Sequence, residues 1–169
     1  MGLIRDTVRY RELIWVLAVK ELQVRYKRSV LGFVWALLHP LLMMVILTLV
    51  FSSVMRIAGV HDYAVFLVCT LFPWTFFGQA VAYGVESIVG NAALLKKVAI
   101  PKFVFPVAAV LANLINFLLS LIPLALLLLV LRYPFHKTWA YLPVPMLSLV
   151  LFTLGCCFFF ATANVYFRD

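Results

Sequence analysis

Few side chains in this sequence have the types and spacing that catalysis needs. There is no GxxxxGK[ST] loop to hold the phosphates of ATP, no HExxH zinc motif and no GxSxG nucleophile motif. Cys69, Cys156 and Cys157 lie inside apolar runs without metal-ligand spacing, which favours reduced cysteines that pack. The predicted membrane spans lack Asp, Glu, Lys or Arg at their centres, so a proton relay has little to work with. We therefore predict a chain that is not an enzyme and that binds no metal or cofactor itself.

The composition indicates a membrane protein. Of the 169 residues, 66% are hydrophobic and 12% are charged, with a mean hydropathy of +1.12, whereas soluble domains carry about 25% charged residues. The net charge of +8 does not indicate nucleic-acid binding, because the Lys and Arg residues lie at the ends of apolar runs, where they contact lipid headgroups. Residues 1–29 contain seven Lys or Arg and no cleavage pattern, so we expect them to remain in the mature protein.

Apolar runs of spanning length predict an all-α, polytopic membrane protein. An amphipathic interfacial segment at 1–29 precedes a membrane-spanning part at 30–169. The four expected spans are residues 30–55, 63–85, 104–131 and 140–163. Eleven of the fourteen Lys and Arg fall in the N-terminal segment, the 86–102 connection and the C-terminal end. By the positive-inside rule, this bias predicts that both ends of the chain are cytoplasmic.

The segment before the first span reads as an amphipathic helix or two. One face is predicted to be apolar and the other polar, with Arg11 intruding on the apolar side as a possible break. The apolar face comprises Ile4, Val8, Trp15, Val19, Leu22 and Tyr26, and the polar face Arg5, Arg9, Glu12, Lys20, Gln23 and Lys27. The candidate interfacial residues are Trp15, Leu22, Arg25, Tyr26, Lys27 and Arg28. A soluble helix packed on a partner protein is the alternative, but the adjacent span favours the membrane interface.

The connection at 86–102 has the start and stop signals of a short helix. Glu86 and Ser87 open it, Lys96 and Lys97 lie near its end, and Pro101 stops it. Its mixed apolar and basic character suits a docking segment for a cytoplasmic partner, and an ordinary surface connection is the alternative. The candidate docking and gating residues are Glu86, Asn91, Lys96, Lys97, Pro101 and Lys102.

Polar and aromatic side chains inside the spans need a protein environment or a cavity. Asn113, Asn116 and Ser120 lie on one face, which should point at another helix or into a cavity, with contact between helices as the favoured reading. Trp74 is flanked by Phe72, Phe76 and Phe77 and could line a path for sugars or lipid, or simply face lipid.

Four stretches in order resemble one family, the polysaccharide-export permeases of the type-2 ABC transporter class. They are KELQVRYKRSVLGFVWALLHPL at 20–41, LFPWTFF at 71–77, NAALLKKVAIPK at 91–102 and NVYFRD at 164–169. This family exports O-antigen, capsular polysaccharide and teichoic acid. Its members have six spans, so the resemblance implies that this chain corresponds to about two-thirds of such a permease.

The resemblance implies a permease of the bacterial inner membrane that pairs with a second copy of itself and with two copies of a separate ATPase. ATP and Mg would bind the ATPase, and a lipid-linked polysaccharide or polyol-phosphate polymer would pass between the two permeases. The candidate channel-lining residues are Trp35, Trp74, Phe76, Phe77, Asn113 and Asn116. The alternatives are a membrane scaffold or assembly subunit without its own path and, last, a lipid-modifying enzyme that would rely on scattered residues such as His61, Asp62 and His136.

Overall fold

The computed structural model describes residues 7–27, 63–98, 100–130 and 141–167, together with scattered positions between 34 and 50. Five helices form this part of the chain: α2 (Arg11–Tyr26), α4 (Tyr63–Gly90), α5 (Ala92–Lys97), α6 (Val104–Val130) and α7 (Pro143–Tyr166). No strand occurs among the described residues, so the predicted all-α class is confirmed. Most of the predicted span at 30–55 lies outside them, as do Arg28 and Trp35.

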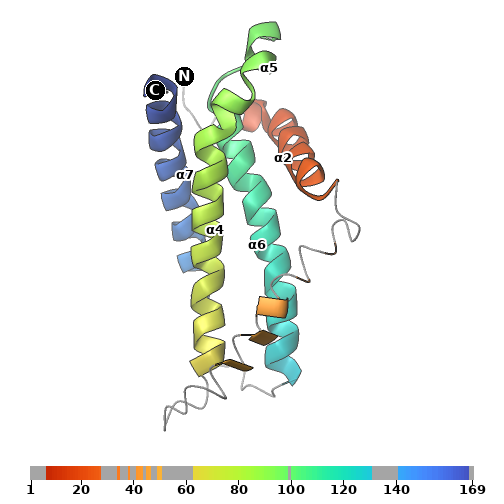
Figure 1. Ribbon diagram of the computed structural model, residues 1–169. Helices are drawn as coiled ribbons and strands as arrows, with labels where there is room; N and C mark the ends of the chain where they lie inside the picture. The colour runs from red at the N-terminus through yellow and green to blue at the C-terminus, as the bar shows by residue number, and fades with distance from the viewer. Residues whose placement is uncertain are drawn as a thin grey trace.

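Three long helices, α4, α6 and α7, stand side by side (Figure 1), with α4 and α7 running in one direction and α6 in the other. Two stretches, Val104–Leu126 of α6 and Pro143–Tyr166 of α7, are long and apolar enough to cross a membrane. The 28 residues of α4 give it a length of about 42 Å, more than the hydrocarbon thickness of a bilayer. Pro143 begins α7, a position where the missing N–H of proline costs nothing.

The polar connection after the second predicted span begins later than its sequence suggests. Helix α4 continues to Gly90, so Glu86 and Ser87 belong to its last turn and do not start the short helix. The Ser87 hydroxyl is buried and donates to the Gly84 carbonyl at 2.6 Å, within its own helix. This internal bond leaves Ser87 no role as a helix cap. The short helix is instead α5, which carries Lys96 and Lys97 in its last turn as predicted.

The core lies where α4 meets α6 and α7. Its buried residues are Phe72, Phe76, Ala80, Val110, Phe117, Leu124, Leu128 and Cys157. Helices α4 and α7 approach closely at Gly84, because a Cβ atom there would lie 2.6 Å from the Cys157 sulfur. The Asn164 amide donates to the Val85 carbonyl at 3.0 Å in the same region. Small residues and polar groups that bond between helices are the usual means by which membrane helices associate.

Helix α2 lies obliquely against the first half of α6 (Figure 1). Its buried residues Ile14, Ala18 and Leu22 pack on Val104, Ala108 and Ala112 of α6. Of the predicted apolar face, Leu22 and Tyr26 lie in this contact, whereas Val8 and Trp15 are 61% and 55% exposed. The helix carries two neighbouring apolar stripes, and the stripe with the small Ala18 fits closely against the alanines of α6. The predicted break is confirmed, since Tyr10 forms a turn and α2 begins at Arg11.

Candidate functional site

Positive charge gathers in one half of the bundle. All eight Lys and Arg side chains of the described residues belong to α2, to its flanking turns, to α5 or to the turn before α6, and α7 ends in the same half. This is the upper half in Figure 1. The three segments that the sequence analysis assigned to one side of a membrane therefore meet at one end, as far as their described residues extend.

The predicted docking residues fall into two groups. Glu86, Lys96, Lys97 and Lys102 are exposed, and α5, which buries none of its residues, extends past the ends of α4 and α6 (Figure 1). Asn91 and Pro101 are half-buried and shape the backbone instead: the Asn91 amide donates to the Ser87 carbonyl at 2.8 Å, and the Pro101 carbonyl accepts from the Val104 N–H. The exposed lysines form a small cationic surface that a partner could reach.

Arg25 joins three helices. It lies on the face of α2 that packs on α6, one turn beyond Leu22. Its Nη1 donates to Asn113 Oδ1 at 3.1 Å, and its guanidinium carbon lies 4.1 Å from the centroid of the Tyr83 ring on α4. Its Nε and Nη2 atoms are buried and have no hydrogen-bond partner among the described residues. The arginine thus ties α2 to both α4 and α6 through one hydrogen bond and one cation–π contact.

The next residue, Tyr26, makes a second link to α6. Its hydroxyl donates to Asn116 Oδ1 at 3.2 Å. Burial raises the pKa of Tyr26, so the phenol stays protonated and remains a donor at neutral pH. Asn113 and Asn116 therefore both face α2, which confirms that the polar stripe of α6 meets another helix. The third polar residue of that stripe, Ser120, bonds within α6 to the Phe117 carbonyl.

Glu21 adds a second charge to this junction. Its carboxylate lies on α2 one turn before Arg25, and burial raises its pKa although the positive charge of Arg25 acts in the opposite direction. Desolvation therefore outweighs the attraction to the arginine. The junction therefore contains Glu21, whose carboxyl group is partly desolvated, and Arg25, of whose three guanidinium nitrogens only Nη1 has a hydrogen-bond partner among the described residues.

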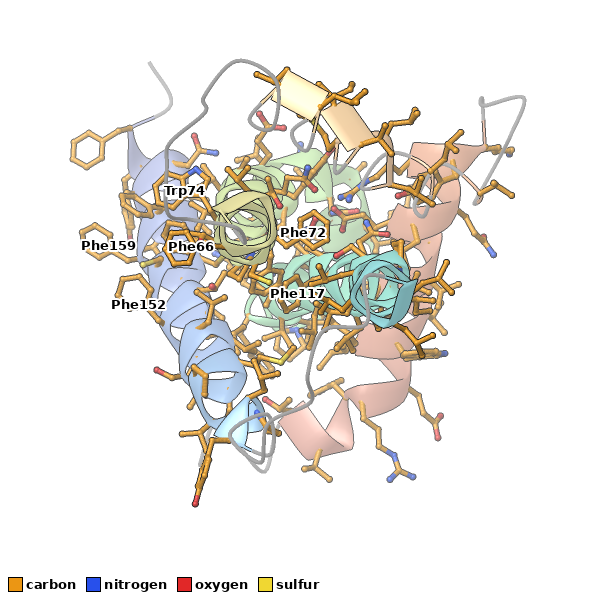
Figure 2. All side chains as sticks on the ribbon, turned by 90° about the horizontal axis from the view of Figure 1, so that it is seen from below. Phe66, Phe72, Trp74, Phe117, Phe152 and Phe159 are labelled. Carbon is orange, nitrogen blue, oxygen red and sulfur yellow. The ribbon has the colours of Figure 1, made fainter. Side chains whose placement is uncertain are left out.

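The aromatic candidates for a channel wall lie in different places. Phe76 is 4% exposed and packs on Phe117 of α6, with 5.3 Å between ring centroids. Trp74 is 66% exposed, and Phe77 stacks on Phe152 of α7 at 5.7 Å. Figure 2 shows Trp74, Phe152 and the exposed Phe66 and Phe159 together on the outer side of α4 and α7, whereas Phe72 and Phe117 lie between α4 and α6.

Two features of the site could not be predicted from the sequence. Tyr83, the partner of the Arg25 guanidinium, lies in the later half of α4, where the polar residues favoured a protein-facing surface but named no partner. Phe152 extends the aromatic surface from α4 onto α7. The only sequence signal for this surface is the density of aromatic residues in the two helices, which does not reveal how the helices are rotated.

The chain is similar in sequence to known membrane-transport proteins. No family model matches it. It is 39% identical over 169 residues to the O-antigen export system permease protein RfbA of Myxococcus xanthus, an alignment that covers 99% of this chain and 64% of that protein. It is 34% identical over 159 residues to a Klebsiella pneumoniae protein of the same name, covering 94% of this chain and 61% of the relative. The chain spans less than two-thirds of the length of these relatives. The resemblance drawn from its four motifs is confirmed, since almost the whole chain is similar to O-antigen export system permeases.

Proposed function

We propose that the chain is part of the permease subunit of an ABC exporter. The exporter moves a lipid-linked polysaccharide or polyol-phosphate polymer across the bacterial inner membrane, and a separate ATPase subunit supplies the energy. The observation that carries this proposal is the similarity to O-antigen export permeases over 94–99% of the chain. Two described helices of membrane-spanning length support it.

The charged half of the bundle faces the cytoplasm in this proposal. Its exposed cations, which are all the described Lys and Arg except Arg25, would meet the lipid headgroups and the ATPase, in accord with the positive-inside rule. Both the N-terminal segment and the end of α7 then lie on the cytoplasmic side.

Helix α5 is the part of this surface that the ATPase would contact. It buries none of its residues, exposes Lys96 and Lys97, and continues directly from α4 through Asn91. A push on α5 would therefore act on the ends of both α4 and α6. Arg25 would carry such a movement to α2, because it contacts Asn113 of α6 and Tyr83 of α4.

The outer aromatic surface of α4 and α7 is the proposed wall of the glycan path. Trp74 and Phe152 are exposed on either side of Phe77, which stacks on Phe152, and sugar rings stack on exposed aromatic faces through their C–H groups. A path would form where this surface meets a second copy of the permease. Phe76 would support the wall from inside the bundle, since it is buried against α6.

Charge reversal on α5 tests the docking role. In the protein purified from its native membrane, Lys96→Glu together with Lys97→Glu should lower the amount of co-purified ATPase by at least about tenfold, because attraction would become repulsion. The matched control reverses Lys20 and Lys27, two exposed lysines of the same half of the molecule, with the same change in net charge. Equal co-purification from the α5 variant and the unmodified protein would rule out the docking role. Equal loss from both double variants would assign the effect to net charge alone.

A further inference from the structure

An apolar groove separates the start of α2 from α7. It has a volume of about 270 Å³ and lies over the first half of α6. Its lining includes Arg11 and Trp15 of α2, Val107 and Leu111 of α6, and Val150 and Leu154 of α7. Of its lining residues, only Arg11 and Thr7 carry a polar side chain apart from the Trp15 indole N–H. The charged half of the bundle thus also contains an apolar groove with an arginine in its lining.

Water is an unsuitable occupant of this groove. An apolar cavity offers water few hydrogen-bond partners, and such cavities stay dry or bind apolar molecules. The groove also opens to the side of the bundle, where Trp15 remains 55% exposed. In a membrane, the hydrocarbon chains of lipids are the apolar groups that lie beside such an opening.

The groove lies at the level in the membrane where the part of an acyl chain nearest its headgroup would lie. Val107 and Leu111 fall within the first eight residues of the apolar stretch Val104–Leu126, just inside the charged end of the bundle. Arg11 is the first residue of α2, its side chain is exposed, and it belongs to the lining of the groove. A cation at the mouth of an apolar groove is complementary to a lipid with an anionic headgroup.

We infer that this groove binds one acyl chain of an anionic membrane phospholipid, whose phosphate contacts Arg11. The lipid fills the space between α2 and α7 that no side chain of the described residues occupies. It thereby holds α2 at a fixed distance from α7, while Ile14 and Leu22 hold the same helix against α6. This binding depends on the membrane location of the chain and not on the identity of the exported polymer.

Trp15 provides a direct probe, because bromine atoms on a lipid chain quench the fluorescence of a tryptophan that they touch. The protein would retain Trp15 as its single tryptophan, with the other three replaced by Phe, and would be placed in vesicles that contain brominated phosphatidylglycerol or brominated phosphatidylcholine. We expect quenching by the anionic lipid to reach half-saturation at about fivefold lower mole fraction, the effect of one arginine near a headgroup phosphate. Native mass spectrometry of the protein with all four tryptophans should retain phosphatidylglycerol with the same preference.

Three variants test whether the preference for the anionic lipid comes from Arg11 and the groove. Arg11→Gln should abolish the fivefold preference, whereas the neighbouring Arg9→Gln, which stays outside the groove lining, should keep it. Val150→Phe should fill the groove and remove the saturable quenching. Equal half-saturation for the two lipids, or equal effects of the two arginine variants, would overturn the inference. Unchanged quenching after Val150→Phe would overturn it as well. So would the absence of any quenching, which would mean that protein fills the groove.

Discussion

Replacing Arg25 and Asn113, singly and together, tests whether the arginine is the link that holds α2 on the bundle. The two side chains share a hydrogen bond of 3.1 Å between Nη1 and Oδ1, in a place where Asn113 is 2% exposed. A hydrogen bond to a charged group contributes about 1.5–3 kcal/mol to stability. Removing either partner alone also leaves a buried polar group unsatisfied. The single variants Arg25→Ala and Asn113→Ala should therefore each destabilise the protein by at least this amount.

The double variant separates the contribution of the Arg25–Asn113 hydrogen bond from the cost of leaving one partner unsatisfied. Its free energy of unfolding should exceed the value expected from adding the two single effects by about 1.5–3 kcal/mol, which is the coupling between the two side chains. Thermal unfolding in detergent, followed by tyrosine and tryptophan fluorescence, measures this coupling. For a protein of this size, about 1 kcal/mol corresponds to a shift of about 2–4 °C in Tm.

The neighbouring pair Tyr26 and Asn116 gives a matched comparison on the same two helices. Its hydrogen bond of 3.2 Å joins two neutral groups, and such bonds contribute about 0.5–1.5 kcal/mol. The cycle with Tyr26→Phe and Asn116→Ala should thus give about half the coupling of the arginine pair. Additive effects of Arg25→Ala and Asn113→Ala, with a coupling below about 0.5 kcal/mol, would refute the assignment of Arg25 as the link.

Three further variants test the packing and the electrostatics. Gly84→Ala should lower the free energy of unfolding by about 1–3 kcal/mol, because the added methyl group would lie 2.6 Å from the Cys157 sulfur. Gly78→Ala is the control: no atom lies within 4 Å of the added methyl group, so this variant should stabilise α4 by about 0.5–1 kcal/mol. Equal effects of the two variants would contradict the close approach of α4 and α7. The raised pKa of Glu21 predicts that stability falls as the pH rises through that pKa, because the folded state disfavours the charged carboxylate. Glu21→Gln cannot ionise and should lack this fall in a Tm series from about pH 4 to pH 8, and an unchanged pH profile would contradict the role of Glu21.

Helix positions could be predicted well from the sequence, because apolar runs of spanning length leave few alternatives. The helix expected at 104–131 is α6, Val104–Val130, and the one expected at 140–163 overlaps α7, Pro143–Tyr166. The polar stripe of Asn113 and Asn116 also predicted a helix contact correctly, since amide groups are costly in hydrocarbon.

Rotation about the helix axis could not be predicted in the same way. The residues of α2 allow two apolar stripes, and only the shape of α6 decides that Ile14, Ala18 and Leu22 are buried while Trp15 stays exposed. The role of Arg25 depends on Tyr83, which is 58 positions away in the sequence and comes near only through the packing of α2, α4 and α6. A basic residue before a span looks the same in sequence whether it contacts lipid headgroups or another helix.

The fate of the glycan in cells that lack this chain tests the central claim most directly. The measurement compares the amount of polymer on the cell surface with the amount of lipid-linked polymer on the cytoplasmic side of the inner membrane. A permease of a polysaccharide exporter predicts that surface polymer is lost while lipid-linked polymer accumulates inside, and that restoring the gene reverses both changes. Normal surface polymer without accumulation inside would contradict the claim.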